Sequence, residues 1–114
     1  DDLDVYSGND DEIVPIMSLG GIGVISVLSN ILPRETHNIC EEFFKGNVEK
    51  ACELQLKYVS LVNALFSDVN PIPVKEAMNM MGLGMGPLRM PLAPMNEAAK
   101  ENLRKELIKH GLIK

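Results

Sequence analysis

The sequence predicts an α/β fold, with one β-α-β unit at the N-terminus followed by four helices. Two short apolar runs, residues 3–7 and 22–27, flank a segment whose apolar residues recur at helical spacing. The second run, IGVISV, is rich in β-branched residues and apolar on both faces, which is typical of a strand in a parallel sheet that helices cover. From Pro33 onward the apolar residues follow a helical period only.

The first strand is expected to end at Gly8, and a short helix should follow it. Asn9 and Asp10 are residue types that cap helices, and the acidic residues after them suit a first turn. Pro15 must lie near the start of this helix, because proline lacks an amide hydrogen. The two glycines after Leu19 should end the helix and lead into the second strand.

Proline, asparagine and glycine set the limits of the later helices. Each of these helices should begin at a proline or an asparagine, and most should end at a glycine. Residues 83–95, rich in Gly, Pro and Met, form a connecting loop between the last two. The expected boundaries are Pro33 and Gly46, Asn47 and Phe66, Asn70 and Gly82, and Asn96 and Gly111.

Composition excludes several functional classes. The net charge is −5 and no basic cluster is present to neutralise phosphates, so we expect no nucleic-acid partner. The longest strongly apolar stretch, residues 22–28, is too short to span a bilayer, so we expect no membrane partner. Cys40 and Cys52 fall in helical patterns, and no histidine or cysteine stands at metal-ligand spacing. We therefore expect two reduced, packed thiols, no metal or other cofactor, and a cytoplasmic setting.

Most candidate functional residues have a simpler structural explanation. GLGMG, residues 82–86, lacks the full glycine fingerprint of a nucleotide loop and follows a helix instead of a strand, so a flexible connection is expected. Ser26 and Ser29 have no accompanying general base. His37 and His110 stand among polar helix residues, as surface histidines do.

Gly8 and its neighbours are the exception. Ligands in α/β folds bind at the carboxyl ends of parallel strands, and a glycine there lets the backbone approach a small molecule. Asn9 and Asp10 add polar groups and a helix N-terminus, which suit an anionic ligand. A plain turn at Gly8, with Asn9 or Asp10 as a helix cap, explains the same residues. The residues alone leave both interpretations open.

Four segments match a known pattern in order and spacing: YSGNDD, LGGIGVISVLSN, NPIPVKEAM and LRMPLAP. They resemble the C-terminal part of the dihydrodipicolinate synthase family, and the likeness covers essentially all 114 residues. The family is an eight-stranded β/α (TIM) barrel with a C-terminal helical extension. The resemblance implies that residues 1–46 are the last two β/α units of the barrel and residues 47–114 the extension. Because the first residue, Asp1, is not a methionine, we expect a piece of a longer chain.

The resemblance also implies an activity. The family condenses pyruvate with aspartate semialdehyde through a lysine Schiff base, at the entry to diaminopimelate and lysine biosynthesis. Its catalytic lysine, tyrosine, threonine and arginine would all precede Asp1. We therefore expect this chain to be inactive alone and to need the N-terminal part of the barrel as its partner. The family's tetramers imply a homo-oligomer, with the short helix around Pro15 to Leu19 near a subunit contact.

For this chain, the resemblance implies a share in the wall of the pyruvate pocket. Ile25 matches the position whose backbone borders bound pyruvate, and Gly8 and Asn9 match the backbone segment beside the substrate. Many family members have aspartate where this chain has Asn9, so a role for that side chain is not implied. Two alternatives stay open: the same portion of a related pyruvate aldolase of the N-acetylneuraminate lyase type, and a non-catalytic helical interaction module.

Overall fold

The computed structural model describes residues 2–114, and its regular elements in that range are helices. The chain forms two compact units, the first ending at Val59 and the second spanning Ser60–Lys114. The division falls inside the long helix α3 (Val48–Leu65), which contributes to both units. No helix in the described part of the chain is long and apolar enough to cross a membrane. The boundary expected between residues 46 and 47 would separate the last barrel units from the helical extension, and it stays a prediction.

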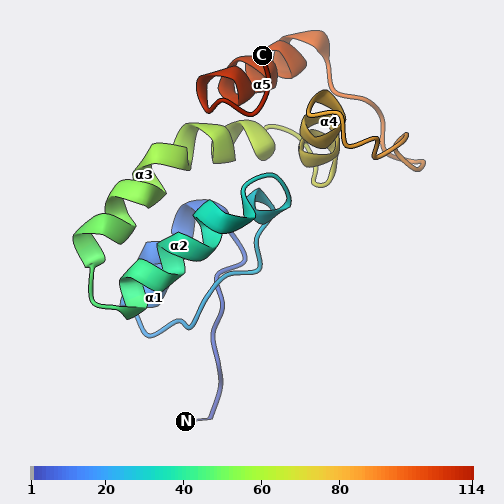
Figure 1. The fold of residues 1–114 in the computed structure, drawn as a ribbon. Helices are drawn as coiled ribbons and strands as arrows, with labels where there is room; N and C mark the ends of the chain where they lie inside the picture. Colours follow the sequence, from blue (N-terminus) through green and yellow to red (C-terminus); the bar gives the residue numbers. More distant parts are fainter. Residues whose placement is uncertain (1) are drawn as a thin grey trace. The chain divides into compact units, whose positions relative to one another are not determined.

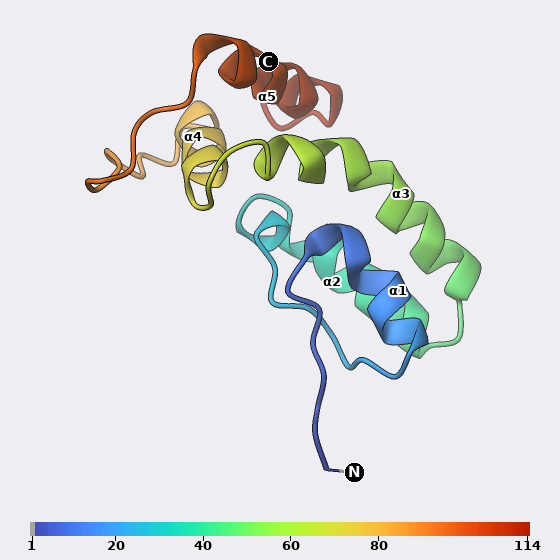
Figure 2. The same ribbon diagram turned by 180° about the vertical axis from the view of Figure 1, so that it is seen from behind.

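The first unit is built from α1 (Ile13–Ser18), α2 (Pro33–Phe44) and the first turns of α3. Figures 1 and 2 show α1 lying beside α2. Two short 3-10 turns precede these helices, η1 (Asp10–Glu12) and η2 (Leu28–Asn30). Gly46 has a φ of +85° between α2 and α3, a left-handed conformation that glycine adopts at little steric cost. The short crossover helix and the helix opened by Pro33 were both predicted correctly.

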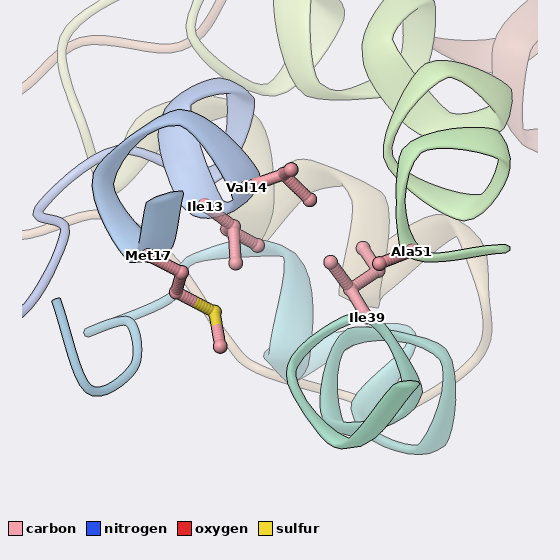
Figure 3. Packing of buried hydrophobic residues seen from close by; sticks show 5 residues of the cluster. All are labelled: Ile13, Val14, Met17, Ile39 and Ala51. Atoms are coloured by element: carbon pink, nitrogen blue, oxygen red, sulfur yellow. The ribbon is translucent and has the colours of Figure 1, made fainter. Parts of the chain in front are cut away.

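A small apolar core joins the three helices of this unit. Figure 3 shows its side chains pointing toward one another from α1, α2 and α3. Each of its members is at most 7% exposed: Ile13, Val14, Met17, Ile39 and Ala51. Cys40 and Cys52 are partly buried against this core, which confirms that both side chains are packed.

In place of the two expected strands, the structure of residues 2–114 has two extended segments joined by a single bridge. Residues 3–7 and 22–27 form no regular strand in the described part of the chain, and one parallel bridge, Ser7 to Val24, joins them. Ser7 N donates to Gly23 O at 2.8 Å, and Ile22 N donates to Val5 O at 2.8 Å. The parallel direction was predicted correctly, but the extent was wrong, because two short segments without flanking strands sustain little ladder. Figures 1 and 2 show the beginning of the first segment extending away from the helices.

The second unit holds the end of α3, α4 (Ile72–Met80) and α5 (Glu97–Lys109). Its most buried side chains are fully shielded from solvent: Leu61, Leu65, Leu103 and Leu107. The predicted caps of the last helix are confirmed. Asn96 Oδ1 accepts a hydrogen bond from Ala99 N at 2.8 Å, and Gly111 has a φ of +71°.

One expectation for the second unit needs correction. The side chain of His110 is only 6% exposed and lies 3.6 Å from the Glu106 carboxylate, so it is not a surface histidine. The chain folds back after α5, where Leu112 N donates to Leu107 O at 2.9 Å. In the loop after α4, Lys75 Nζ donates to Pro87 O at 2.6 Å and Met85 N donates to Asn79 Oδ1 at 2.7 Å, and the flexibility of this loop stays a prediction.

Candidate functional site

The first extended segment ends in a tight turn at Gly8. The Ser7 hydroxyl, in a residue that is 2% exposed, donates to Asn9 O at 2.7 Å and accepts from Asn9 N at 3.2 Å. The φ of Gly8 is not positive, and a Cβ built on it would meet no atom within 4 Å. Gly8 and Asn9 are both exposed, so this turn presents bare backbone to its surroundings.

Ile25 lies beside this turn on the second extended segment. Its amide donates to Ser7 O at 2.9 Å, next to the bridge between Ser7 and Val24. The residue is 71% exposed, so its side chain has little packing within this chain. The structure therefore brings Ile25, Gly8 and Asn9 together at the ends of two parallel segments.

Asp10 has a different role from the one expected. Neither Asn9 nor Asp10 caps the first helix with its side chain, because Asn9 makes no cap bond and the Asp10 carboxylate turns inward. Asp10 is 1% exposed and accepts hydrogen bonds from the Ser26 hydroxyl, from Val27 N at 2.9 Å and from Leu28 N at 3.0 Å. It thus caps η2, after the second segment.

Gln55, on α3, binds the main chain at Asp10. Its Nε2 donates to Asp10 O at 2.7 Å, and its Oε1 accepts from Val14 N at 3.1 Å. The residue is 7% exposed. Sequence reasoning missed this residue, although a signal was present: Gln55 interrupts the apolar stripe that runs from Ala51 to Val62. No comparable signal separates Asp10 from its acidic neighbours.

A hollow of about 310 Å³ opens in the first unit next to these segments. Tyr6, Val24, Ser29, His37 and Cys40 are among its lining residues. Burial raises the pKa of the Cys40 thiol, so the neutral form is favoured and the thiol is not activated as a nucleophile. Residues 2–44 contain no lysine. This part of the chain offers shape and backbone groups to a ligand, but no amine for covalent chemistry.

Comparison with known proteins places this chain in a family. The model of the Dihydrodipicolinate synthetase family matches residues 1–110. The chain is 63% identical over 111 residues to the 4-hydroxy-tetrahydrodipicolinate synthase of Caldicellulosiruptor saccharolyticus, covering 97% of this chain and 38% of that protein. It is 58% identical over 114 residues to the protein of the same name from Clostridium tetani, covering 100% of this chain and 39% of that protein.

A solved structure agrees with the sequence relatives. The dihydrodipicolinate synthase from Thermotoga maritima matches with a TM-score of 0.94 at 46% identity, covering 98% of this chain and 38% of that chain. This chain therefore spans less than two fifths of the length of that structure. Because the family model, the sequence relatives and the fold all agree, this chain belongs to the dihydrodipicolinate synthetase family.

Proposed function

We propose that this chain is the C-terminal portion of a 4-hydroxy-tetrahydrodipicolinate synthase. Such an enzyme condenses pyruvate with aspartate semialdehyde through a lysine Schiff base, in lysine and diaminopimelate biosynthesis. The observation that carries the proposal is 63% identity over 111 residues to a relative of that name. The same identity argues against a sugar-acid aldolase of the N-acetylneuraminate lyase type and against a free-standing interaction module.

In the complete enzyme, residues 3–7 and 22–27 would be the seventh and eighth strands of a β/α barrel. Residues 1–46 would then form its last two units and residues 47–114 the helical extension. The parallel bridge between the two segments supports this placement. So does their exposure, since Leu3 is 83% exposed and Val5 48% exposed. Exposed apolar side chains and unpaired strand edges are stabilised when another strand or helix packs against them. The N-terminal part of the barrel would supply these neighbours.

Gly8, Asn9 and Ile25 would form one wall of the pyruvate pocket. They lie at the carboxyl ends of two parallel segments, the end at which barrel enzymes bind substrates. The small Gly8 would let pyruvate approach the backbone, and the Ile25 backbone would border it from the second segment. The Schiff-base lysine would come from the part of the enzyme before Asp1. This chain would then contribute binding and positioning while the other part carries the covalent chemistry.

The complete enzyme would be a cytoplasmic homo-oligomer. The family's tetramers imply this assembly, with α1 near a subunit contact. Leu19, at the end of α1, is 86% exposed, which supports a further partner for that surface.

Borohydride trapping tests the proposal. The complete enzyme and the 114-residue chain are each mixed with pyruvate, reduced and weighed by mass spectrometry, with pyruvate omitted as the control. We expect one pyruvate-derived adduct on a lysine of the complete enzyme upstream of this chain, and none on the chain alone. No adduct on the complete enzyme would refute the proposed function. A specific adduct on a lysine of this chain, for example Lys57 or Lys75, would show instead that catalysis does not belong to the upstream part.

A further inference from the structure

We propose that Asp10 is a positioning residue for the pyruvate site, because its carboxylate holds the backbone after Ile25 against the turn at Gly8. This inference rests on the proposed function and deepens it, since it names the group that sets the geometry of the pocket wall.

The contacts of the Asp10 carboxylate join the two halves of that wall. Asp10 follows Gly8 by two residues, and its three donors are Ser26, Val27 and Leu28, the residues directly after Ile25. The bonds from Val27 N at 2.9 Å and Leu28 N at 3.0 Å have lengths normal for amides bound to a carboxylate. One buried side chain thus sets the spacing between the turn at Gly8 and the backbone at Ile25, the two halves of the predicted wall.

Asp10 is itself held from two sides. Gln55 Nε2 binds its main-chain oxygen at 2.7 Å, which ties it to α3. On the other side, the Ser26 hydroxyl also accepts from Ser29 N at 2.9 Å. The neighbouring Asp11 is exposed, although it carries the same charge. The bridging role therefore belongs to one position and not to the acidic cluster as a whole.

Ile25 depends on this bridge because its side chain is not fixed by packing. The residue is 71% exposed, and its own link to the first segment is one backbone bond to Ser7 O. Removing the carboxylate would leave two amides and a hydroxyl without their acceptor, and the backbone would shift to find new partners. A displacement of this kind beside a bound substrate is expected to weaken binding and orientation.

Steady-state kinetics of the complete enzyme test the inference. We expect Asp10→Ala to raise the KM for pyruvate by about tenfold or more, while the KM for aspartate semialdehyde changes by less than about twofold. Asp10→Asn should recover part of the loss, because its amide oxygen still accepts from Val27 N and Leu28 N. Asp11→Ala is the matched control, removing the same charge one residue away, and should leave both constants unchanged.

A second control separates positioning from stability. Ile39→Ala, in the core of the first unit, should lower the melting temperature without changing either KM. If Asp10→Ala does not fold, Ser26→Ala takes its place, with an expected rise in pyruvate KM of about threefold.

The outcomes are distinct. A folded Asp10→Ala enzyme whose pyruvate KM stays within about twofold of the wild type would overturn the inference, as would an equal rise in Ile39→Ala. Where Ser26→Ala is the variant used, an unchanged pyruvate KM would overturn it. Failure of the wild-type enzyme to form a pyruvate imine would refute the proposed function itself, and that measurement precedes the variants.

Discussion

Replacing Gly8 by valine in the complete enzyme should lower turnover and leave stability nearly unchanged. The φ of Gly8 is not positive, so a valine meets no left-handed strain there. A Cβ at this position has no atom of this chain within 4 Å, so it meets no steric clash either. We therefore expect the free energy of unfolding to change by less than about 0.5 kcal/mol, as at an ordinary exposed site.

The catalytic cost should be much larger. The branched side chain would project from the proposed pocket wall and displace pyruvate from its reacting geometry. A displacement of about 1 Å costs about a hundredfold in rate, which corresponds to about 2.7 kcal/mol of transition-state stabilisation. Gly8→Ala adds one carbon only and should lose about tenfold.

The assay combines pyruvate kinetics with a thermal melt, and Gly46→Ala is the control with the opposite signature. Gly46 has a φ of +85° and also has no atom within 4 Å of a built Cβ, so alanine is strained there without a clash. It should cost about 1–2 kcal/mol in stability while the kinetics stay unchanged. Normal pyruvate kinetics in folded Gly8→Val would remove Gly8 from the pocket wall. If Gly8→Val lowered the melting temperature more than Gly46→Ala does, Gly8 would be shown to be a structural turn.

Three further predictions follow from the first unit. Gln55→Leu removes two buried hydrogen bonds and should lower the free energy of unfolding by about 2–4 kcal/mol in a denaturant titration. Glu53→Leu, at an exposed site on α3, is the control with a small expected change. Equal losses in the two variants would contradict the prediction. Burial raises the pKa of the Cys40 thiol, so the pH midpoint of its alkylation should lie above that of an unfolded thiol. Stability should fall as the pH rises from the pKa of the unfolded thiol to that of the folded one. An alkylation midpoint equal to that of an unfolded thiol would contradict the burial of Cys40. In the 114-residue chain, the Ile25 amide should exchange hydrogen faster than the Ile39 amide, because one parallel bridge protects it poorly; equal protection in a monodisperse monomer, judged by light scattering, would refute this reasoning.

Helix boundaries in this protein could be read from the sequence because they depend on local groups. Pro33 opens α2, and Asn96 caps α5 with its own side chain. Gly46 and Gly111 end helices at positive φ, where other residues are strained. The parallel direction of the two extended segments was also predictable, since a short helix between them leaves room for that connection.

The sequence was less informative wherever burial depended on distant residues. It predicted strands over residues 3–7 and 22–27, but a strand exists only where a neighbour supplies hydrogen bonds, and this chain supplies one bridge. It predicted a surface histidine at position 110, yet that side chain is only 6% exposed in the folded chain.

By itself, the sequence determined the helices, the family resemblance and the three residues proposed for the pocket wall. Only the tertiary structure decided which member of the acidic run at residues 10–12 is buried and what it binds. The Asp10 carboxylate accepts hydrogen bonds from the amides of Val27 and Leu28, which lie 17 and 18 residues further along the chain. Its main-chain oxygen accepts from Gln55, which lies 45 residues further along. Local propensity treats three adjacent acidic residues alike, because only the folded backbone brings donors to one of them and leaves the others in water.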